Sequence, residues 1–246
     1  SVRLTSAGEK LVEELREPFS RIEQSFFSVR DTAGPVRGLV RMTAPVAFAR
    51  QQLVPIIGEF LRDYPQVRLQ LDVTDRIVSL SSVGFDLVMR HSDTLPETHV
   101  ALPLCDTRSL LVASPAYLSL QGVPLSPQDL EQHNCLYYSQ FAGQSWHFTA
   151  ADGEKITAAV KGNFSAGISL LLCDAAIAHC GIAMVPQQEA RRALEAGKLV
   201  NLLPDYEPRR IGIWGLYLSR EHQSAALRLM LDELQRSIGG ENEQRS

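Results

Sequence analysis

The stretch Gly38–Pro45 reads GLVRMTAP, and it begins the pattern that decides the fold. Its largely apolar residues indicate a strand, and Pro45 ends it because proline lacks the N–H that a sheet ladder needs. The residues that follow predict a helix over 48–63, a strand over 67–73, a short helix over 76–83 and a strand over 85–90. This β-α-β-α-β order predicts a parallel sheet with right-handed crossovers.

The rest of the chain predicts a second α/β lobe. Strands are expected over 109–113, 135–138, 146–149, 157–162, 181–186, 199–202 and 211–218, and helices over 168–180, 187–196 and 222–237. A serine followed by proline, at Ser114 and Ser126, predicts the N-caps of two short helices. Two crossings of the chain, near residues 103–108 and near 218, would leave a cleft between the lobes. The predicted division is 37–105 with 219–238 for the first lobe, 106–218 for the second, and 239–246 for a polar tail that is expected to be disordered.

Residues 6–30 predict a long amphipathic helix ahead of the two lobes. One apolar stripe, at spacings of three and four, is formed by Leu11, Leu15, Phe19, Ile22, Phe26 and Val29. The stripe could pack on its own lobe, but we favour a helix–helix dimer, because a free-standing arm has no other core to use. We therefore interpret residues 1–36 as a dimerisation arm and linker that follow a missing N-terminal domain.

Composition and charge exclude several classes of function. The chain has 246 residues and a net charge of −4, whereas a nucleic-acid-binding face is usually basic, so this chain alone is expected to bind DNA poorly. No apolar run approaches the roughly 20 residues that a membrane span needs. The four cysteines are Cys105, Cys135, Cys173 and Cys180. We expect buried, reduced thiols, with a redox switch as the alternative.

The sequence predicts no catalytic residue, cofactor or metal site. Residues 163–167 (NFSAG) lack the first glycine of the G-x-S-x-G nucleophile motif, and no glycine-rich phosphate loop follows a strand. The six histidines are scattered, without the spacing that is typical of zinc ligands. Catalysis assembled only by the three-dimensional fold would escape this test.

A series of short motifs, taken in order, resembles the LysR-type transcriptional regulators. They are Leu4–Gly8 (LTSAG) before the long helix, Thr43–Pro45 (TAP), Leu53–Pro55 (LVP), Phe60–Val67 (FLRDYPQV), Gly84–Arg90 (GFDLVMR), Ala113–Leu118 (ASPAYL), Trp146–Phe148 (WHF), Gly181–Pro186 (GIAMVP) and Gly197–Val200 (GKLV). Each motif is weak by itself, but their order and spacing cover nearly all of residues 2–237.

The resemblance implies a cytoplasmic bacterial regulator. Its effector-binding domain would consist of two Rossmann-like lobes, as in type II periplasmic binding proteins. The family also implies dimers through the linker helix and tetramers through the effector domains. Promoter DNA would be contacted only through a winged helix-turn-helix domain that this chain lacks, apart from a backbone contact by Arg3.

The predicted fold and the resemblance point to the same ligand-binding segments. In doubly wound sheets, ligands lie beyond the carboxyl ends of the strands. The candidate effector contacts are Thr43, Pro45, Val46, Ala47, Phe48, Arg90 and His91 in the first lobe, and Phe164, Ser165, Ala166, Gly167 and Ile168 in the second. Thr43 offers a hydroxyl, and free N–H groups around residues 47–50 could hold an anion. We infer a small effector with an acidic or polar end and an apolar body.

Each of these candidates has a structural alternative. Thr43 could cap the next helix, Arg90 could pair with Asp86 or Asp93, and His91 could be solvated. Phe48 and Phe164 are as readily explained by packing in a core. Relatives often carry a polar residue where this chain has Ala166–Ile168, which leaves a side-chain hydrogen bond to the effector in doubt there.

Two other classes of protein share the predicted fold. A solute-binding protein of a transport system would bind a similar ligand, but it would need a signal sequence and no helical arm. An enzyme on the same fold would need a catalytic motif, and none is found in the sequence.

Overall fold

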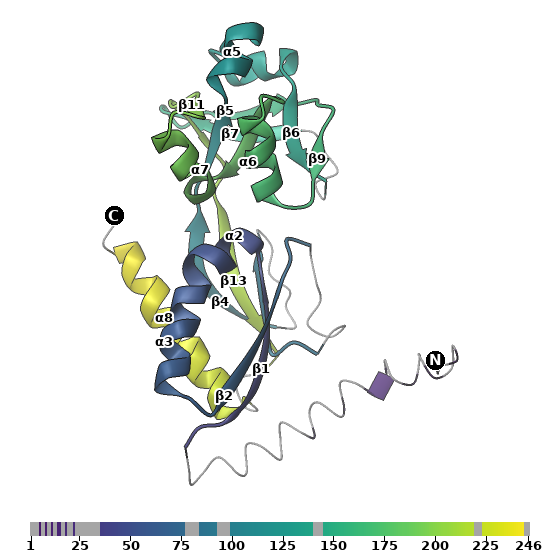
Figure 1. Ribbon diagram of the computed structural model, residues 1–246, viewed down its shortest axis with the longest axis vertical. Coiled ribbons are helices and arrows are strands. Elements are labelled where there is room, and N and C mark those ends of the chain that lie inside the picture. The colour runs from purple at the N-terminus through teal and green to yellow at the C-terminus, as the bar shows by residue number, and fades with distance from the viewer. Residues whose placement is uncertain are drawn as a thin grey trace. The chain divides into compact units, whose positions relative to one another are not determined.

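The computed structural model describes residues 35–76, 84–92, 99–139, 145–218 and 223–243, together with Thr5, Gly8, Leu11, Glu14, Leu15, Pro18 and Ile22 of the arm. The chain forms two compact units (Figure 1). Unit 1 consists of residues 1–105 and 212–246, and unit 2 of residues 106–211.

Unit 1 is built on a five-stranded sheet with the order β2-β1-β3-β13-β4. The bounds are β1 Gly38–Ala44, β2 Val67–Val73, β3 Leu87–His91, β4 Val100–Thr107 and β13 Ile211–Tyr217. Strand β1 runs parallel to β2 and β3, but β13 runs antiparallel to β3, so the sheet is mixed and not purely parallel. The edge strand β4 was not predicted from the sequence.

The pairing of β13 corrects the predicted boundary of the first lobe. Residues 211–218 were assigned to the second lobe, with the crossing near 218. The register pairs Ile213 with His91 and Leu216 with Val88, so this strand belongs to the sheet of unit 1. The crossing therefore lies between Ile211 and Gly212.

One face of this sheet is covered by helices. The first is continuous from Val46 to Asp63: α2 Val46–Phe48, a π-helical segment Ala49–Leu53 and α3 Val54–Asp63. It begins two residues before the predicted start. It packs with α8, Ala225–Glu243, over the strands, and the shared core includes Met42, Phe60, Leu87, Met230 and Leu234.

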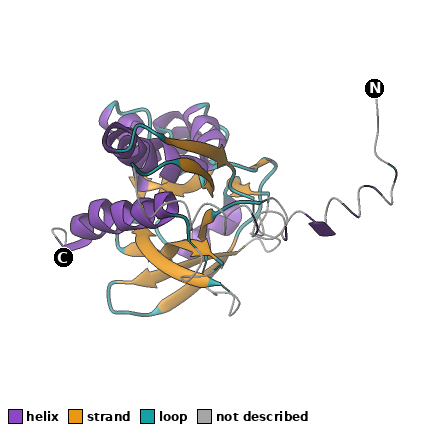
Figure 2. Ribbon diagram, turned by 90° about the horizontal axis from the view of Figure 1, so that it is seen from below, coloured by secondary structure: helices purple, strands orange, loops and turns teal. Residues whose placement is uncertain are grey.

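Helix α8 corrects the prediction of a disordered tail for residues 239–243, whereas residues 244–246 lie outside the described residues. The helix continues to Glu243, as Figure 2 shows near the marked C-terminus. The helix is stabilised by residues that pack in the core, such as Leu234 and Ile238. Because adding a residue to an existing helix costs little free energy, the helix extends to residues such as Glu241.

Unit 2 contains a five-stranded and a three-stranded sheet. The first has the order β11-β5-β10-β6-β9 and the second β12-β7-β8. The strands are β5 Ser109–Ala113, β6 Cys135–Tyr138, β7 Ser145–Ala150, β8 Lys155–Ala159, β9 Ser165–Ala166, β10 Ile182–Pro186, β11 Val200–Leu202 and β12 Tyr206–Pro208. The helices are α5 Pro115–Gln121, the 3-10 helix η2 Pro127–Gln132, α6 Ser169–Ile177 and α7 Gln187–Glu195.

Local capping residues define several helix ends in unit 2. The Ser114 hydroxyl accepts a hydrogen bond from the Tyr117 N–H at 3.3 Å, as the serine-proline pattern predicts. Gly197, with φ of 67°, follows α7. Helix α6 ends at Ile177, three residues earlier than predicted, and His179 then adopts a left-handed φ of 65°.

In the arm, the described residues Leu11, Leu15 and Ile22 are helical, and their side chains are exposed. The Thr5 hydroxyl accepts a hydrogen bond from the Gly8 N–H at 3.2 Å. The predicted stripe residues Phe19, Phe26 and Val29 lie outside the described residues, as do 77–83 of the predicted short helix.

All four cysteines are free thiols, but they are not all buried as predicted. Cys135 and Cys173 are buried, and burial raises the pKa of their thiols to about 12 and about 11. Cys105 is partly buried, whereas Cys180 is exposed because it lies in the turn after α6 and not in the helix itself.

Candidate functional site

Thr43 is a buried polar residue on the sheet face opposite the helices. Its neighbours Met42 and Ala44 belong to the core beneath α3 and α8, and side chains alternate along a strand, so Thr43 points to the other face. The residue is 1% exposed, and its hydroxyl has no hydrogen-bond partner among the described residues. It does not cap the next helix, because the N-cap position is Pro45 and no side chain caps this start.

Arg90 lies on the same face as Thr43. The register pairs Thr43 with Val88, and Arg90 is two residues further along β3, opposite Trp214 of β13. The Nε of Arg90 is buried and, within the described part of the chain, has no hydrogen-bond partner. Two buried polar groups without partners therefore face the same way near the carboxyl ends of β1 and β3.

The alternative in which Arg90 pairs with Asp86 is wrong. The Asp86 carboxylate accepts the backbone N–H of Arg41 at 2.8 Å, and the Asp86 N–H donates to the Arg41 carbonyl at 2.8 Å. These bonds hold Asp86 at the start of β3, whereas Arg90 lies near the end of the strand. The other predicted partner, Asp93, lies outside the described residues.

The start of the helix after Pro45 already carries a negative charge. The Val46 N–H donates to the Asp75 carboxylate at 2.9 Å. The Ala49 N–H donates to the Pro45 carbonyl at 2.8 Å, so it is not free to hold an anion as predicted. A carboxylate at a helix N-terminus satisfies the helix dipole and repels a second anion. An anion is therefore attracted more strongly to the side chain of Arg90 than to this helix start.

His91 is partly buried, so the alternative of a freely solvated side chain is wrong. Burial lowers the pKa of its imidazole, and the nearby Asp75 carboxylate opposes this effect by raising the pKa. The neutral form is therefore favoured around pH 7, so that Arg90 is the cationic side chain at this end of β3. Phe48 is 3% exposed and belongs to the core, and Pro45 and Ala47 are also buried.

The candidate residues of unit 2 surround the start of α6. Strand β9 pairs in parallel with β6, with Ser165 opposite Tyr137 and Ala166 opposite Tyr138. Ala166 is buried, whereas Ser165 and Phe164 are exposed. Phe164 is therefore a surface residue in this unit and not part of its core.

No side chain of the described residues caps the start of α6. Ile168 holds the N-cap position, and the first turn contains no acidic residue. The leading N–H groups of α6 are therefore available to an acceptor atom, in contrast to the helix start in unit 1. Leu171, on the first turn, is 48% exposed and adds apolar surface that the sequence reasoning missed.

Asp75 was also missed from the sequence. It lies two residues after the end of β2, and the N–H from which it accepts a hydrogen bond is 29 residues away in the chain. The only sequence signal for it is an acidic residue just beyond the carboxyl end of a predicted strand.

The described residues offer neither of two other kinds of site. They include no cluster of three or more histidine, cysteine or acidic side chains that could hold a metal ion. Within the same residues, no helix combines the length and apolar character needed to cross a membrane.

The two α/β units have the fold of the regulatory domains of LysR-type regulators, which is related to type II periplasmic binding proteins. Residues 33–239 match the family described as the LysR substrate binding domain, so the chain belongs to the LysR-type transcriptional regulators.

Relatives with known names agree with this assignment. The chain is 30% identical over 241 residues to a Klebsiella pneumoniae protein named "Probable HTH-type transcriptional regulator LtrA", covering 96% of this chain and 78% of that one. It is 27% identical over 234 residues to the transcriptional activator TtdR of Escherichia coli K12, covering 95% and 75%.

Solved structures show the same architecture. The full-length structure of AphB, a virulence activator of Vibrio cholerae, matches with a TM-score of 0.77 at 25% identity, covering 96% of this chain and 81% of that one. The regulatory domain of CrgA from Neisseria meningitidis matches in fold with a TM-score of 0.71, covering 82% and 100%. The chain is thus the effector-binding region of a transcription regulator, and the transport-protein alternative is rejected.

Proposed function

We propose that this regulator senses a small molecule with a carboxylate or similar acceptor group, and that Thr43 and Arg90 bind that group. The observation that carries the proposal is the pair of buried groups, Thr43 Oγ1 and Arg90 Nε, that have no partner among the described residues. A buried polar group without a partner costs about 1–3 kcal/mol, so a ligand that supplies the partner recovers this free energy.

The chemistry of the two side chains narrows the class of ligand. Arg90 Nε is a donor only, and the Thr43 hydroxyl can donate or accept. A carboxylate suits both groups, because hydrogen bonds between a guanidinium and a carboxylate are charge-assisted. The neutral His91 adds no second cation, which favours one acidic group over two at this place.

We propose further effector contacts in unit 2 at the start of α6. The uncapped N–H groups there suit an acceptor atom, and exposed Phe164 and Leu171 suit an apolar body. Ser165 and Gly167 border the same segment. Thus the ligand class inferred for unit 1 also fits the residues of unit 2.

The regulatory step is proposed to be a shift between two states of the protein. An effector can shift that equilibrium only by binding one state more tightly than the other. The exposed apolar side chains Leu11, Leu15 and Ile22 support self-association of the chain through the arm. We propose that the change of state passes through this arm to the DNA. Membership of the family supports a cytoplasmic regulator that binds promoter DNA as an oligomer.

A thermal-shift screen with small organic acids tests the proposal. At least one acid is expected to raise the melting temperature, since a ligand that binds only the folded state stabilises it. Thr43→Val should reduce that shift. The matched change Thr149→Val, at an exposed position of β7, should leave it intact. A screen in which no acid stabilises the protein, or equal shifts in both variants, would count against the proposed site.

A further inference from the structure

Unit 2 contains a pocket of about 340 Å³ that shares no residue with the candidate effector contacts. It is lined by the start of β5 with the preceding Arg108, by the segment from β11 to β12, and by Gln187 at the start of α7. The volume is within the range of pockets that hold small molecules.

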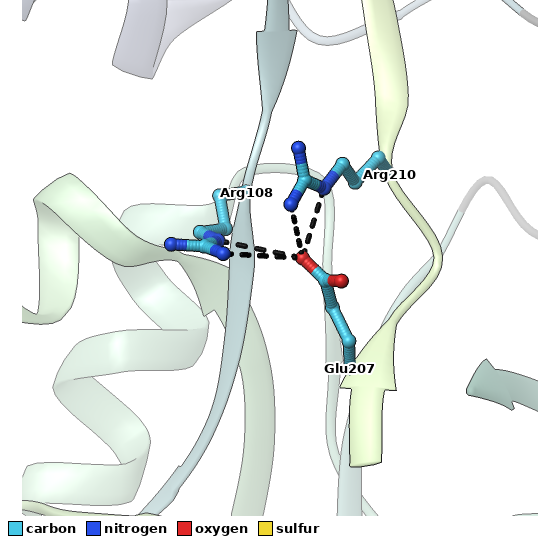
Figure 3. Close-up of polar contacts among 3 residues, drawn as sticks. All are labelled: Arg108, Glu207 and Arg210. Carbon is cyan, nitrogen blue, oxygen red and sulfur yellow. Dashed lines mark hydrogen bonds and ion pairs between the residues drawn. The ribbon is translucent and has the colours of Figure 1, made fainter. Parts of the chain in front are cut away.

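Two residues that line this pocket, Arg108 and Glu207, form a charged cluster with the neighbouring Arg210 (Figure 3). Glu207 Oε1 accepts hydrogen bonds from Arg210 Nε at 2.8 Å and from Arg108 Nε and Nη2 at 3.4 Å each. Arg210 Nη2 is 2.7 Å from the same oxygen. Arg210 thus holds the carboxylate closely, whereas the bonds from Arg108 are long and weak.

The cluster leaves both a cation and a carboxylate oxygen available to a ligand. Two guanidinium groups share one carboxylate, so the cluster carries an excess of positive charge. Glu207 Oε2 has no bond to any of the residues that the structure describes, and Figure 3 shows this oxygen pointing away from both arginines. The two arginines lower the pKa of the Glu207 carboxyl, chiefly through the hydrogen bond from Arg210, so the group stays ionised at neutral pH.

The rest of the pocket combines leucine and proline side chains with four polar residues, and one of its residues has an unusual backbone conformation. Among the described residues, the side chains of Ser109, Gln187, Asn201 and Tyr206 find no hydrogen-bond partner, so their polar groups can serve a ligand. Leu203 in the same wall has a left-handed φ of 51°, which is rare for leucine, and its side chain is buried in the core. Such backbone strain is found preferentially where a site is built.

We infer that this pocket binds a small carboxylic acid whose neighbouring carbon carries an ammonium or hydroxyl group. Arg108 exchanges its long contacts with Glu207 for shorter, charge-assisted bonds to the ligand carboxylate. Glu207, still held by Arg210, accepts a hydrogen bond from the ligand's ammonium or hydroxyl group on Oε2. No covalent step is involved.

The position of the pocket in the chain gives the binding a regulatory consequence. Arg108 directly follows β4, and Arg210 directly precedes β13, the two strands by which the chain passes from one unit to the other. Glu207 is bonded to Arg108, next to β4, and to Arg210, next to β13. A ligand that binds Arg108 breaks the first of these two bonds. Binding here therefore acts on the connections between the units without touching Thr43 or Arg90.

Titration of the full, 15N-labelled chain with glycine, glycolate and acetate, followed by NMR, tests this inference. Saturable shifts are expected at the Tyr206 amide and the Arg108 Nε–H for glycine and glycolate, with weaker binding of acetate. The titrations use the Thr43→Val/Arg90→Gln variant as well, and the same shifts there separate this pocket from the proposed effector site. Shifts that vanish in that variant would overturn the inference.

Three single variants sharpen the test. Arg108→Ala should weaken glycine and glycolate binding about tenfold or more, because it removes a charge-assisted hydrogen bond. The matched loss of an exposed arginine on α7, Arg191→Ala, should leave binding unchanged. If the pocket prefers an ammonium group, Glu207→Gln should weaken the binding of glycine more than that of glycolate. If it prefers a hydroxyl group, the binding of both should weaken about equally. Absence of saturable shifts with all three probes, or unaltered binding in Arg108→Ala, would overturn the inference.

Discussion

The two units both place a helix after a strand near the candidate effector residues, but the two helix starts differ in charge. In unit 1 the Asp75 carboxylate accepts the Val46 N–H at 2.9 Å. In unit 2 the start of α6 has neither a side-chain cap nor an acidic residue in its first turn. The helix start in unit 1 thus disfavours an anion, whereas the helix start in unit 2 can donate N–H groups to an acceptor atom. In the proposed site, unit 1 would supply side-chain donors and unit 2 would supply backbone N–H groups.

The largest effect is expected from Arg90→Gln in unit 1. If Arg90 carries the charge that receives the effector, its loss should cost about 1.5–3 kcal/mol of binding free energy for a stabilising acid. Calorimetric titration measures this change. Arg62→Gln, which removes an exposed arginine from α3, is the control and should bind normally. Equal affinities of the two variants would mean that the charge of Arg90 is not used.

Thr43→Val should have opposite effects on the ligand-free chain and on ligand binding. Valine has nearly the same shape and removes a hydroxyl for which the described residues supply no partner, so the free energy of unfolding without ligand should rise by about 1 kcal/mol. Effector affinity should fall at the same time. Urea denaturation measures the first effect, with the exposed Thr149→Val as reference. A loss of stability in Thr43→Val would show that the hydroxyl has an unrecognised partner.

Asp75→Asn should make the helix start in unit 1 resemble that in unit 2. Asparagine can still accept the Val46 N–H, so the change removes mainly a charge that favours the helix dipole, at a cost of about 0.3–1 kcal/mol. The pKa of His91 should fall further, because Asp75 raises it in the native chain. NMR titration of His91 reads this shift directly, and a higher pKa in the variant would contradict the account.

The same variant has a predicted pH dependence. The folded-state pKa of His91 lies below its ordinary value of 6.5, so below pH 6.5 the unfolded chain binds more protons at this residue. Protonation of His91 therefore lowers the free energy of unfolding as the pH falls from 6.5 through the folded-state pKa. Well above pH 6.5 the residue is neutral in both states and has no such effect. Asp75→Asn should steepen the loss between pH 7 and pH 5.5, and urea denaturation at these two values measures the difference.

The sequence predicted the parts of the fold that depend on local pattern. Strand β1, the Ser114 cap and the glycine after α7 follow from short-range rules, and all three are present. Strand β4 was missed because Pro103 interrupts its pattern, although proline is tolerated in an edge strand. The assignment of β13 depends on its pairing with β3, more than 100 residues away in the chain, which no local pattern reveals.

The candidate site was predictable only in part for the same reason. Thr43 and Arg90 could be selected because they lie at the ends of predicted strands. Their lack of partners could not be foreseen, since it depends on the face to which each side chain points. Asp75 escaped notice because its bond joins positions 29 residues apart.

Gly167→Ala is expected to have the smallest effect. A Cβ at this position would meet the Ser139 hydroxyl at 3.8 Å, an ordinary contact, so stability should change by less than about 0.5 kcal/mol. Gly181→Ala is the contrasting change, because its Cβ would lie 2.2 Å from the Asn134 carbonyl oxygen and must distort the backbone. Thermal denaturation compares the two, and a large loss in Gly167→Ala would place an unexpected constraint before α6.

The most direct measurement is a crystal structure of the chain with a stabilising organic acid bound. The proposal predicts that an acceptor atom of the ligand lies within hydrogen-bond distance of Thr43 Oγ1 and Arg90 Nε, both of which are buried without a partner among the described residues. A ligand that binds elsewhere and leaves both groups without a partner would contradict it.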